Sequence, residues 1–279
     1  MAANTPADET AVRALSDDHD LSSLRVLHVE DQPGFADLTE TGLARVDPEI
    51  TVDHVETVAA AVERLAADRP AYDCVVSDYD LPDADGLSLL RTVRDRGPAL
   101  PFLLFNGQGS ESVAADAVAA GADDYLQKER GLGQFTVLAH RIGVAVRRAR
   151  ADRTLCRAVE AIEATGEGIG LVDCDGERSF FYCNTSYADI LGYEPSTLVD
   201  SAWSRVHAAE TVPEAVTETL SETDAWNGVT SFARADGTTV ELPHRVERTD
   251  DGTLICTIPR ANDAAGGEPS ARTGERRAD

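Results

Sequence analysis

Five short apolar runs alternate with amphipathic segments between Leu24 and residue 149, and this alternation constrains the fold more than any other feature of the chain. The runs are LRVLHV (24–29), ITVDHV (50–55), DCVVS (73–77), PFLLF (101–105) and DYLQ (124–127). The segments between them, at about 34–46, 57–68, 86–96, 110–120 and 133–149, are helical candidates. In the second, apolar residues recur at the spacing of a helix buried on one side: Val58, Ala61, Val62, Leu65 and Ala66. Repeated β-α units predict a doubly wound α/β domain, with five parallel strands covered by helices on both faces.

The remaining sequence divides into four further segments. Residues 1–22 and 261–279 are poor in apolar residues and are expected to be a disordered arm and a disordered tail. Residues 150–165 contain no Gly or Pro and predict a helical linker. Leu155, Val159 and Ile162 in this linker have a 4-3 spacing, which leaves both self-association and an ordinary surface helix open.

Residues 166–260 predict a second, smaller domain. Two strands (169–173 and 179–184) joined by a turn at Asp175 and Gly176 precede helices that extend to about residue 223. Three further strands follow (228–235, 238–249 and 253–260), separated by Asp-Gly turns. This order predicts an α+β domain with a five-stranded antiparallel sheet.

The composition restricts partners and location. The net charge is −25, with 50 acidic and 25 basic residues, which argues against binding nucleic acid or an anionic membrane through bulk charge. Lys128 is the one Lys among those basic residues, and the others are Arg. This pattern is typical of salt-adapted organisms. The five Cys form no C-x-x-C pair, and the sequence shows no signal peptide or membrane span, so we expect a cytoplasmic protein.

Polar residues follow four of the five predicted strands. Glu30 and Asp31 follow the first, Asp78 follows the third, Asn106 and Gly107 follow the fourth, and Lys128 follows the fifth. Because ligands bind at the carboxyl ends of parallel strands, we expect these groups to form one site. Grouped carboxylates suit Mg²⁺, and one of them can act as a nucleophile toward phosphorus.

The segment 23–149 resembles the receiver domains of two-component response regulators, which have a flavodoxin-like fold. The resemblance rests on VEDQP, SDYDLPDADGL, FNGQGSE and GADDYLQK. The successive spacings are 47 residues from Asp31 to Asp78, 28 from Asp78 to Asn106 and 22 from Asn106 to Lys128. It implies that Asp78 accepts a phosphoryl group from a sensor histidine kinase. It also implies that Glu30, Asp31, Asp78 and the backbone carbonyl of Asp80 hold Mg²⁺. Lys128, Asn106 and Gly107 would contact the phosphoryl group, and Tyr125 would be the switch residue.

Two positions depart from the receiver pattern. The family usually has Ser or Thr at the position of Asn106, where the hydroxyl bonds the phosphoryl oxygen. An Asn amide can also donate a hydrogen bond but is longer and planar, so a weakened switch is expected. The family also favours Pro after its Lys, where this chain has Glu129.

Residues 166–260 resemble a PAS domain through GEGIGLVDCDG, YCNTSYADILGYEPSTLV and ADGTTVELPHRVERTDDGTLICTI. Its ligand, if it binds one, is not indicated by the sequence. We expect a receiver–PAS regulator that signals through contacts with a downstream protein, without nucleic-acid or membrane partners and without a separate enzymatic domain. The linker helix or the PAS domain is a candidate surface for a homodimer.

Two other functions remain open. The receiver could be a scaffold that is never phosphorylated, which the missing hydroxyl at Asn106 would suit. Asp78-Tyr79-Asp80 could also be the D-x-D motif of a phosphohydrolase, although Lys128 and the acids after the first strand favour the receiver. Of the histidines, His28 is expected to be a core residue with its hydrogen bonds satisfied. His207 is expected in a loop, without haem.

Overall fold

The computed structural model describes residues 23–67, 72–97, 100–107, 111–174, 178–208, 216, 218–220 and 222–260. The chain divides into two compact units, with the boundary in sequence between Ala158 and Val159. The predicted arm (1–22), the predicted tail (261–279) and the predicted turn at Asp175 and Gly176 lie outside the described residues. Among the helices that the structure describes, none has the length and apolar content needed to cross a membrane.

The first unit contains a parallel sheet of five strands. The strands are β1 (Leu24–Val29), β2 (Ile50–Val55), β3 (Cys74–Ser77), β4 (Phe102–Asn106) and β5 (Asp124–Gln127). Their order in the sheet is β2-β1-β3-β4-β5, and all neighbouring strands are parallel. The central strands β3 and β4 are buried at every residue, as expected for a sheet covered on both faces. The predicted flavodoxin-like sheet is therefore confirmed.

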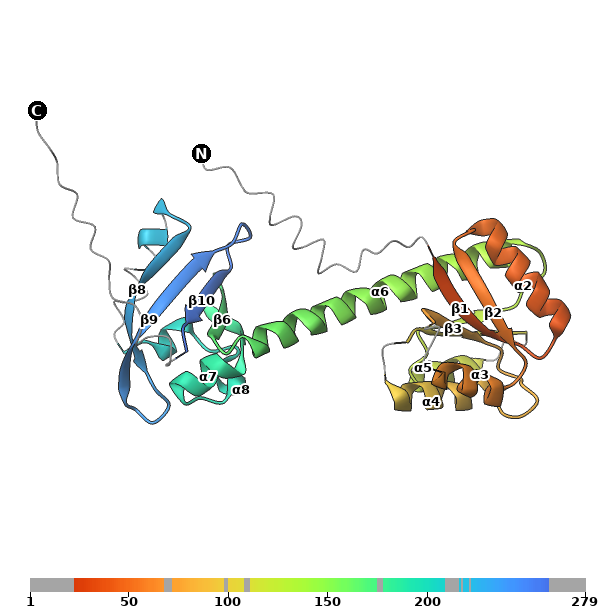
Figure 1. The fold of residues 1–279 in the computed structure, drawn as a ribbon, viewed down its shortest axis with the longest axis horizontal. Helices are drawn as coiled ribbons and strands as arrows, with labels where there is room; N and C mark the ends of the chain where they lie inside the picture. Colours follow the sequence, from red (N-terminus) through yellow and green to blue (C-terminus); the bar gives the residue numbers. More distant parts are fainter. Residues whose placement is uncertain are drawn as a thin grey trace, which may run out of the picture. The chain divides into compact units, whose positions relative to one another are not determined.

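Helices cover both faces of this sheet (Figure 1). On one face, α2 (Pro33–Val46) and the first half of α6 (Gly133–Ala164) pack against the sheet through Leu43, Phe135 and Ile142. The other face carries α3 (Val58–Ala66), α4 (Gly86–Arg96) and α5 (Glu111–Ala119). The last buried residue of α6 is Val146, so the predicted linker is helical but contributes nothing to the core. Whether its exposed residues self-associate stays open.

The second unit contains an antiparallel sheet of five strands. They are β6 (Gly168–Asp173), β7 (Ser179–Cys183), β8 (Ala225–Ala233), β9 (Thr239–Arg248) and β10 (Leu254–Ile258), in the order β7-β6-β10-β9-β8. Short helical segments pack on the sheet: α7 (Thr185–Leu191), α8 (Pro195–Leu198) and the 3₁₀ turn η1 (Trp203–Val206). Buried aromatic side chains from both layers form the core, including Phe180, Tyr187, Trp203 and Phe232.

The prediction of helix from residue 185 to about 223 is wrong in part. After α7 the chain makes a left-handed turn at Gly192, and after α8 it makes another at Asp200, whose φ is 63°. These turns let Ala202 and His207 form isolated bridges with strand residues Ser179 and Phe232. A continuous helix could not make these bridges and also bury Trp203.

Two histidines lie in the core of this unit. His207, which we expected in a loop, is 7% exposed and stacks on Phe232 with ring centres 5.6 Å apart. His244 is 2% exposed, and its Nδ1 lies 3.0 Å from the hydroxyl of Thr230. The Nε2 atoms of both rings have no hydrogen-bond partner among the described residues. Burial lowers the pKa of His207 to about 4 and the pKa of His244 to about 3.

We therefore expect the second unit to lose stability in mild acid. In the unfolded chain these histidines are protonated below about pH 6.5, whereas in the folded protein they are protonated only near pH 3–4. Between these pH values the unfolded state binds more protons, so the free energy of unfolding decreases as the pH is lowered. The slope approaches about 1.4 kcal/mol per pH unit for each such histidine. Denaturant unfolding between pH 7.5 and 4.5, followed by tryptophan fluorescence, measures it, because both Trp residues belong to this unit.

The control for this prediction is His244→Leu. This variant removes one buried titrating group, so its unfolding free energy should depend less steeply on pH than that of the wild type. Parallel curves for the two proteins would contradict the role of His244, because the carboxylates common to both would then account for the whole pH dependence.

Candidate functional site

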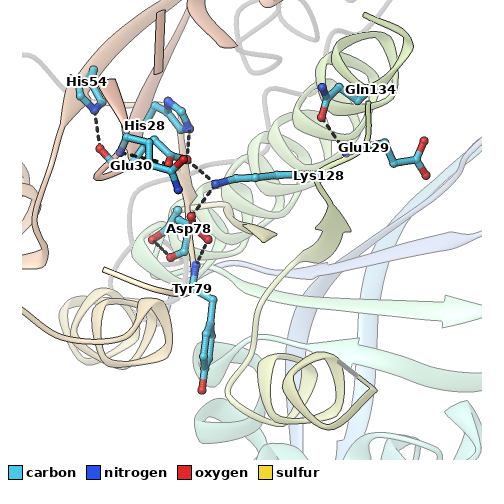
Figure 2. A network of polar contacts seen from close by, with 10 residues as sticks. His28, Glu30, His54, Asp78, Tyr79, Lys128, Glu129 and Gln134 are labelled. Atoms are coloured by element: carbon cyan, nitrogen blue, oxygen red, sulfur yellow. Dashed lines mark hydrogen bonds and ion pairs between the residues drawn. The ribbon is translucent and has the colours of Figure 1, made fainter. Parts of the chain in front are cut away.

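Charged side chains from three strands meet at the carboxyl edge of the parallel sheet (Figure 2). Glu30 and Asp31 directly follow β1, Asp78 follows β3 and Lys128 follows β5. One carboxylate oxygen from each of Glu30, Asp31 and Asp78 lies within 4.8 Å of the other two. The structure thus brings together four residues that the sequence predicted to share a site.

The ammonium group of Lys128 lies between two of these carboxylates. Its Nζ is 2.5 Å from Oε2 of Glu30 and 2.6 Å from Oδ2 of Asp78. The same atom lies 4.4 Å from the centre of the Phe35 ring, which adds a cation–π contact. With its side chain only 11% exposed, Lys128 interacts with all three groups where water screens charge weakly.

The three carboxylates differ in burial. Glu30 is fully buried and Asp78 is 5% exposed, whereas Asp31 is exposed to solvent. Burial raises the pKa of Glu30, and the hydrogen bond and charge of Lys128 oppose this rise. Glu30 therefore depends on neighbouring donors to remain ionised, whereas water can solvate Asp31.

Hydrogen bonds fix the orientation of Asp78. Its Oδ1 accepts a hydrogen bond of 2.6 Å from the backbone N–H of Tyr79, and its Oδ2 pairs with Lys128. Its own N–H donates to the carbonyl of Val29, which links the end of β3 to the end of β1. Both carboxylate oxygens of Asp78 thus have donors.

The other predicted site residues lie on or shortly after β3, β4 and β5. Asn106 ends β4 and is 3% exposed, and its carbonyl accepts a 2.7 Å hydrogen bond from the backbone N–H of Lys128. Gly107 is exposed at the end of the same strand. Tyr125 is half-buried on β5, opposite Leu104 in the sheet register, and Asp80 is exposed beyond Asp78. The Asp80 side chain is not part of the cluster of three carboxylates among the described residues.

The acid-rich segment after β3 has a divided role. Asp83 accepts hydrogen bonds of 2.9 Å from the N–H groups of Val58 and Ala59, and therefore caps α3. Asp85 caps α4 by accepting from the N–H of Ser88 at 2.7 Å. Among these acids, only Asp78 takes part in the charged cluster.

Gly86 keeps the start of α4 close to Asp78. A Cβ at this position would lie 2.3 Å from the backbone oxygen of Asp78 and 2.9 Å from Leu104. The N–H of Gly86 donates to the carbonyl of Tyr79 at 2.8 Å. A residue without a side chain is thus required for α4 to begin this close to the end of β3.

Sequence reasoning missed three aromatic neighbours of the site. Phe35 faces Lys128, His54 places Nε2 2.7 Å from the carbonyl of Glu30, and Nε2 of His28 lies 4.0 Å from Oε2 of Glu30. His28 is buried as predicted, but both ring nitrogens have no hydrogen-bond partner among the described residues, so the expectation of a satisfied histidine was wrong. His28 is two residues from Glu30, and this proximity was the available signal.

The carboxylate cluster fits a magnesium ion in its chemistry. Its ligands are hard oxygen atoms, one carboxylate is exposed to water, and Mg²⁺ usually retains several waters in such sites. Opposite ligands of Mg²⁺ are about 4.2 Å apart, because each lies about 2.1 Å from the ion. The three carboxylate oxygens lie within 4.8 Å of one another, somewhat farther apart than the ligands of a bound Mg²⁺ would be.

Comparison with known proteins supports the assignment of the first unit. Residues 26–139 match the family model described as response regulator receiver domain. The chain is 35% identical over 120 residues to the transcriptional regulatory protein CutR of Streptomyces coelicolor, covering 43% of this chain and 54% of CutR. It is 33% identical over 118 residues to the response regulator protein PilR of Pseudomonas aeruginosa, covering 42% of this chain and 26% of PilR.

A solved structure is also similar to this part of the chain. The non-phosphorylated HemR receiver domain of Leptospira biflexa is 27% identical, covering 43% of this chain and 94% of that domain, with a TM-score of 0.38. The chain spans about a quarter to a half of the length of the curated relatives named above. The family match confirms the predicted receiver domain for residues 26–139. Because CutR is named as a transcriptional regulator, the expected absence of a nucleic-acid partner is not supported.

The close contact at Gly86 leads to a stability prediction. Gly86→Ala places a methyl group against a backbone oxygen, so we expect it to lower the free energy of unfolding by about 2 kcal/mol or more. Gly34→Ala is the matched control, since Gly34 also lies in the first turn of a helix but has open space within 4 Å of the position that a methyl group would take. It should change stability by less than about 1 kcal/mol. Equal effects in denaturant unfolding would contradict the steric argument.

Proposed function

We propose that the first unit is a phosphoryl-accepting switch and that Asp78 is the residue that accepts the phosphoryl group. The proposal is carried by one observation: the Asp78 carboxylate has donors on both oxygens, including Lys128, and lies beside Glu30 and Asp31. The donor would be a phosphohistidine of a sensor kinase, which is the partner of receiver domains.

In the proposed reaction, an oxygen of Asp78 attacks phosphorus. The new P–O bond forms an acyl phosphate while the P–N bond of the phosphohistidine breaks, leaving its electron pair on the imidazole nitrogen. When bound at Glu30, Asp31, Asp78 and the carbonyl of Asp80, Mg²⁺ supplies positive charge next to the phosphoryl oxygens. Lys128 supplies the second positive charge, and Asn106 and Gly107 lie at the end of β4, where they would contact the transferred group.

We further propose that the second unit is a PAS domain that acts as a sensor or interaction module. The order β7-β6-β10-β9-β8 and the short helices between β7 and β8 support this proposal. The output would pass through protein contacts to a downstream partner, and no ligand is assigned to this unit. The rival D-x-D phosphohydrolase is disfavoured because the second acid of the motif, Asp80, is exposed and outside the carboxylate cluster.

The first test is whether Asp78 is labelled. Treatment with acetyl phosphate and Mg²⁺ at high salt should add one phosphoryl group to the wild type, as measured by intact mass, and Asp78→Asn should abolish the addition. Asp80→Asn is the control, because Asp80 is proposed to contribute only its backbone carbonyl and should still be labelled. Asp31→Ala or EDTA should greatly reduce labelling.

Equal labelling of the wild type and Asp78→Asn would contradict the nucleophile. A wild type that is never labelled, either by acetyl phosphate or by a kinase, would favour the scaffold. Steady release of inorganic phosphate from phosphate monoesters would favour the phosphohydrolase.

The second test concerns the strength of the switch. The amide of Asn106 is longer than the hydroxyl that receivers usually have, so we expect phosphorylation to change β4 and β5 only slightly in the wild type. Asn106→Thr should enlarge the phosphorylation-dependent change in hydrogen exchange over residues 101–128, where Tyr125 lies. If the wild type already shows the full change and Asn106→Thr adds nothing, the Asn is an adequate substitute.

A further inference from the structure

The buried ring of His28 lies beside the site, and neither of its nitrogen atoms makes a hydrogen bond among the described residues. His28 is 1% exposed on β1. Leaving such a group unpaired is destabilising, and an apolar side chain at the same place would avoid this cost. In β1, which lies between β2 and β3 in the sheet, an apolar residue would be the ordinary choice.

The carboxylate of Glu30 is a charged group close to the His28 ring. Nε2 of His28 lies 4.0 Å from Oε2 of Glu30, about 1 Å beyond hydrogen-bond distance (Figure 2). This oxygen is the one that pairs with Lys128 at 2.5 Å. The other oxygen of Glu30 makes a long contact of 3.4 Å with the N–H of Gln32. Glu30 is fully buried, so water cannot replace Lys128 if the ammonium group moves away.

Phosphorylation of Asp78 would draw Lys128 toward a new anionic group. The ammonium already contacts Asp78 at 2.6 Å, and a phosphoryl group on that residue carries more negative charge than the carboxylate of Glu30. Lys128 would then weaken its bond to Oε2 of Glu30. One oxygen of Glu30 would then bind Mg²⁺, whereas the other would lack a donor, and a buried acceptor without a donor is destabilising.

We propose that His28 is a positioning residue, which donates a hydrogen bond from Nε2 to the Glu30 carboxylate when Lys128 engages the phosphoryl group. The inference rests on the proposed function of Asp78 and Glu30. The role is that of a hydrogen-bond donor, because His28 is 1% exposed and its Nε2 has no hydrogen-bond partner among the described residues. By holding Glu30, His28 would keep that carboxylate in place as a metal ligand.

The arrangement around the ring agrees with this role. His54 faces His28 across the β1–β2 pair, with ring centres 6.0 Å apart, and its Nε2 bonds the backbone carbonyl of Glu30 at 2.7 Å. The backbone of Glu30 is thereby anchored while its carboxylate is left to Lys128 and His28. A rotation of the Glu30 side chain, without movement of β1, would be enough to close the 4.0 Å gap.

The test compares two variants in the full chain. His28→Leu fills the strand without a donor, whereas His28→Gln keeps an N–H group near the position of Nε2. Binding of beryllofluoride with Mg²⁺, which mimics a phosphorylated aspartate, is followed by the NMR shift of the Tyr79 amide. We expect His28→Leu to bind about ten-fold more weakly than the wild type and His28→Gln to bind nearly as well. In a Glu30→Ala background, His28→Leu should have no further effect.

Stability separates this role from simple packing. In EDTA, without beryllofluoride, His28→Leu should unfold at an equal or higher denaturant concentration than the wild type, because it removes an unsatisfied buried group. Equal beryllofluoride affinity in the wild type and His28→Leu would overturn the proposal. A parallel loss of stability and affinity in both variants would also overturn it, in favour of a packing role. A wild type that does not bind beryllofluoride at all would contradict the proposed function itself.

Discussion

The contact of one ammonium group with two buried carboxylates is the interaction on which the first unit depends. Lys128, Glu30 and Asp78 lie at the ends of three different strands, and their charges could not be removed from water unless they were paired. The same pairing explains why a chain whose other basic residues are all Arg has a Lys here. A compact ammonium can approach two carboxylate oxygens within 2.6 Å, whereas the planar guanidinium of Arg is wider and directs its hydrogens in a fixed fork.

Around this contact, the fold assigns structural tasks to residues that look alike in the sequence. Asp83 and Asp85 satisfy the free N–H groups at the starts of α3 and α4, and Gly86 lets α4 begin against the carbonyl of Asp78. These contacts fix the loop after β3. Backbone hydrogen bonds then hold Asp78 in one orientation. A carboxylate held in this way would need little reorganisation in the proposed phosphoryl transfer.

Unsatisfied buried histidines occur in both units, with different consequences. In the second unit, His207 and His244 lie among aromatic rings in the core, and their burial lowers the pKa of both side chains. In the first unit, His28 lies next to a buried carboxylate and has a ligand-dependent role in our proposal. The sequence alone does not separate these cases, because a histidine in an apolar run looks the same whether its neighbour in space is a ring or a carboxylate.

The sequence by itself determined the β-α alternation, the α+β order of the second unit and the residues that end the strands, because hydrophobic periodicity and strand ends are local properties. It therefore predicted that Glu30, Asp31, Asp78 and Lys128 would share one edge of the sheet. Only the tertiary structure decided that Lys128 bridges Glu30 and Asp78, that Asp83 caps α3, that His207 enters a core and that His28 lies unsatisfied beside Glu30. The residues that make these contacts are 2 to 98 positions apart in the chain. The contacts form through side-chain packing between elements, which hydrophobic periodicity does not encode.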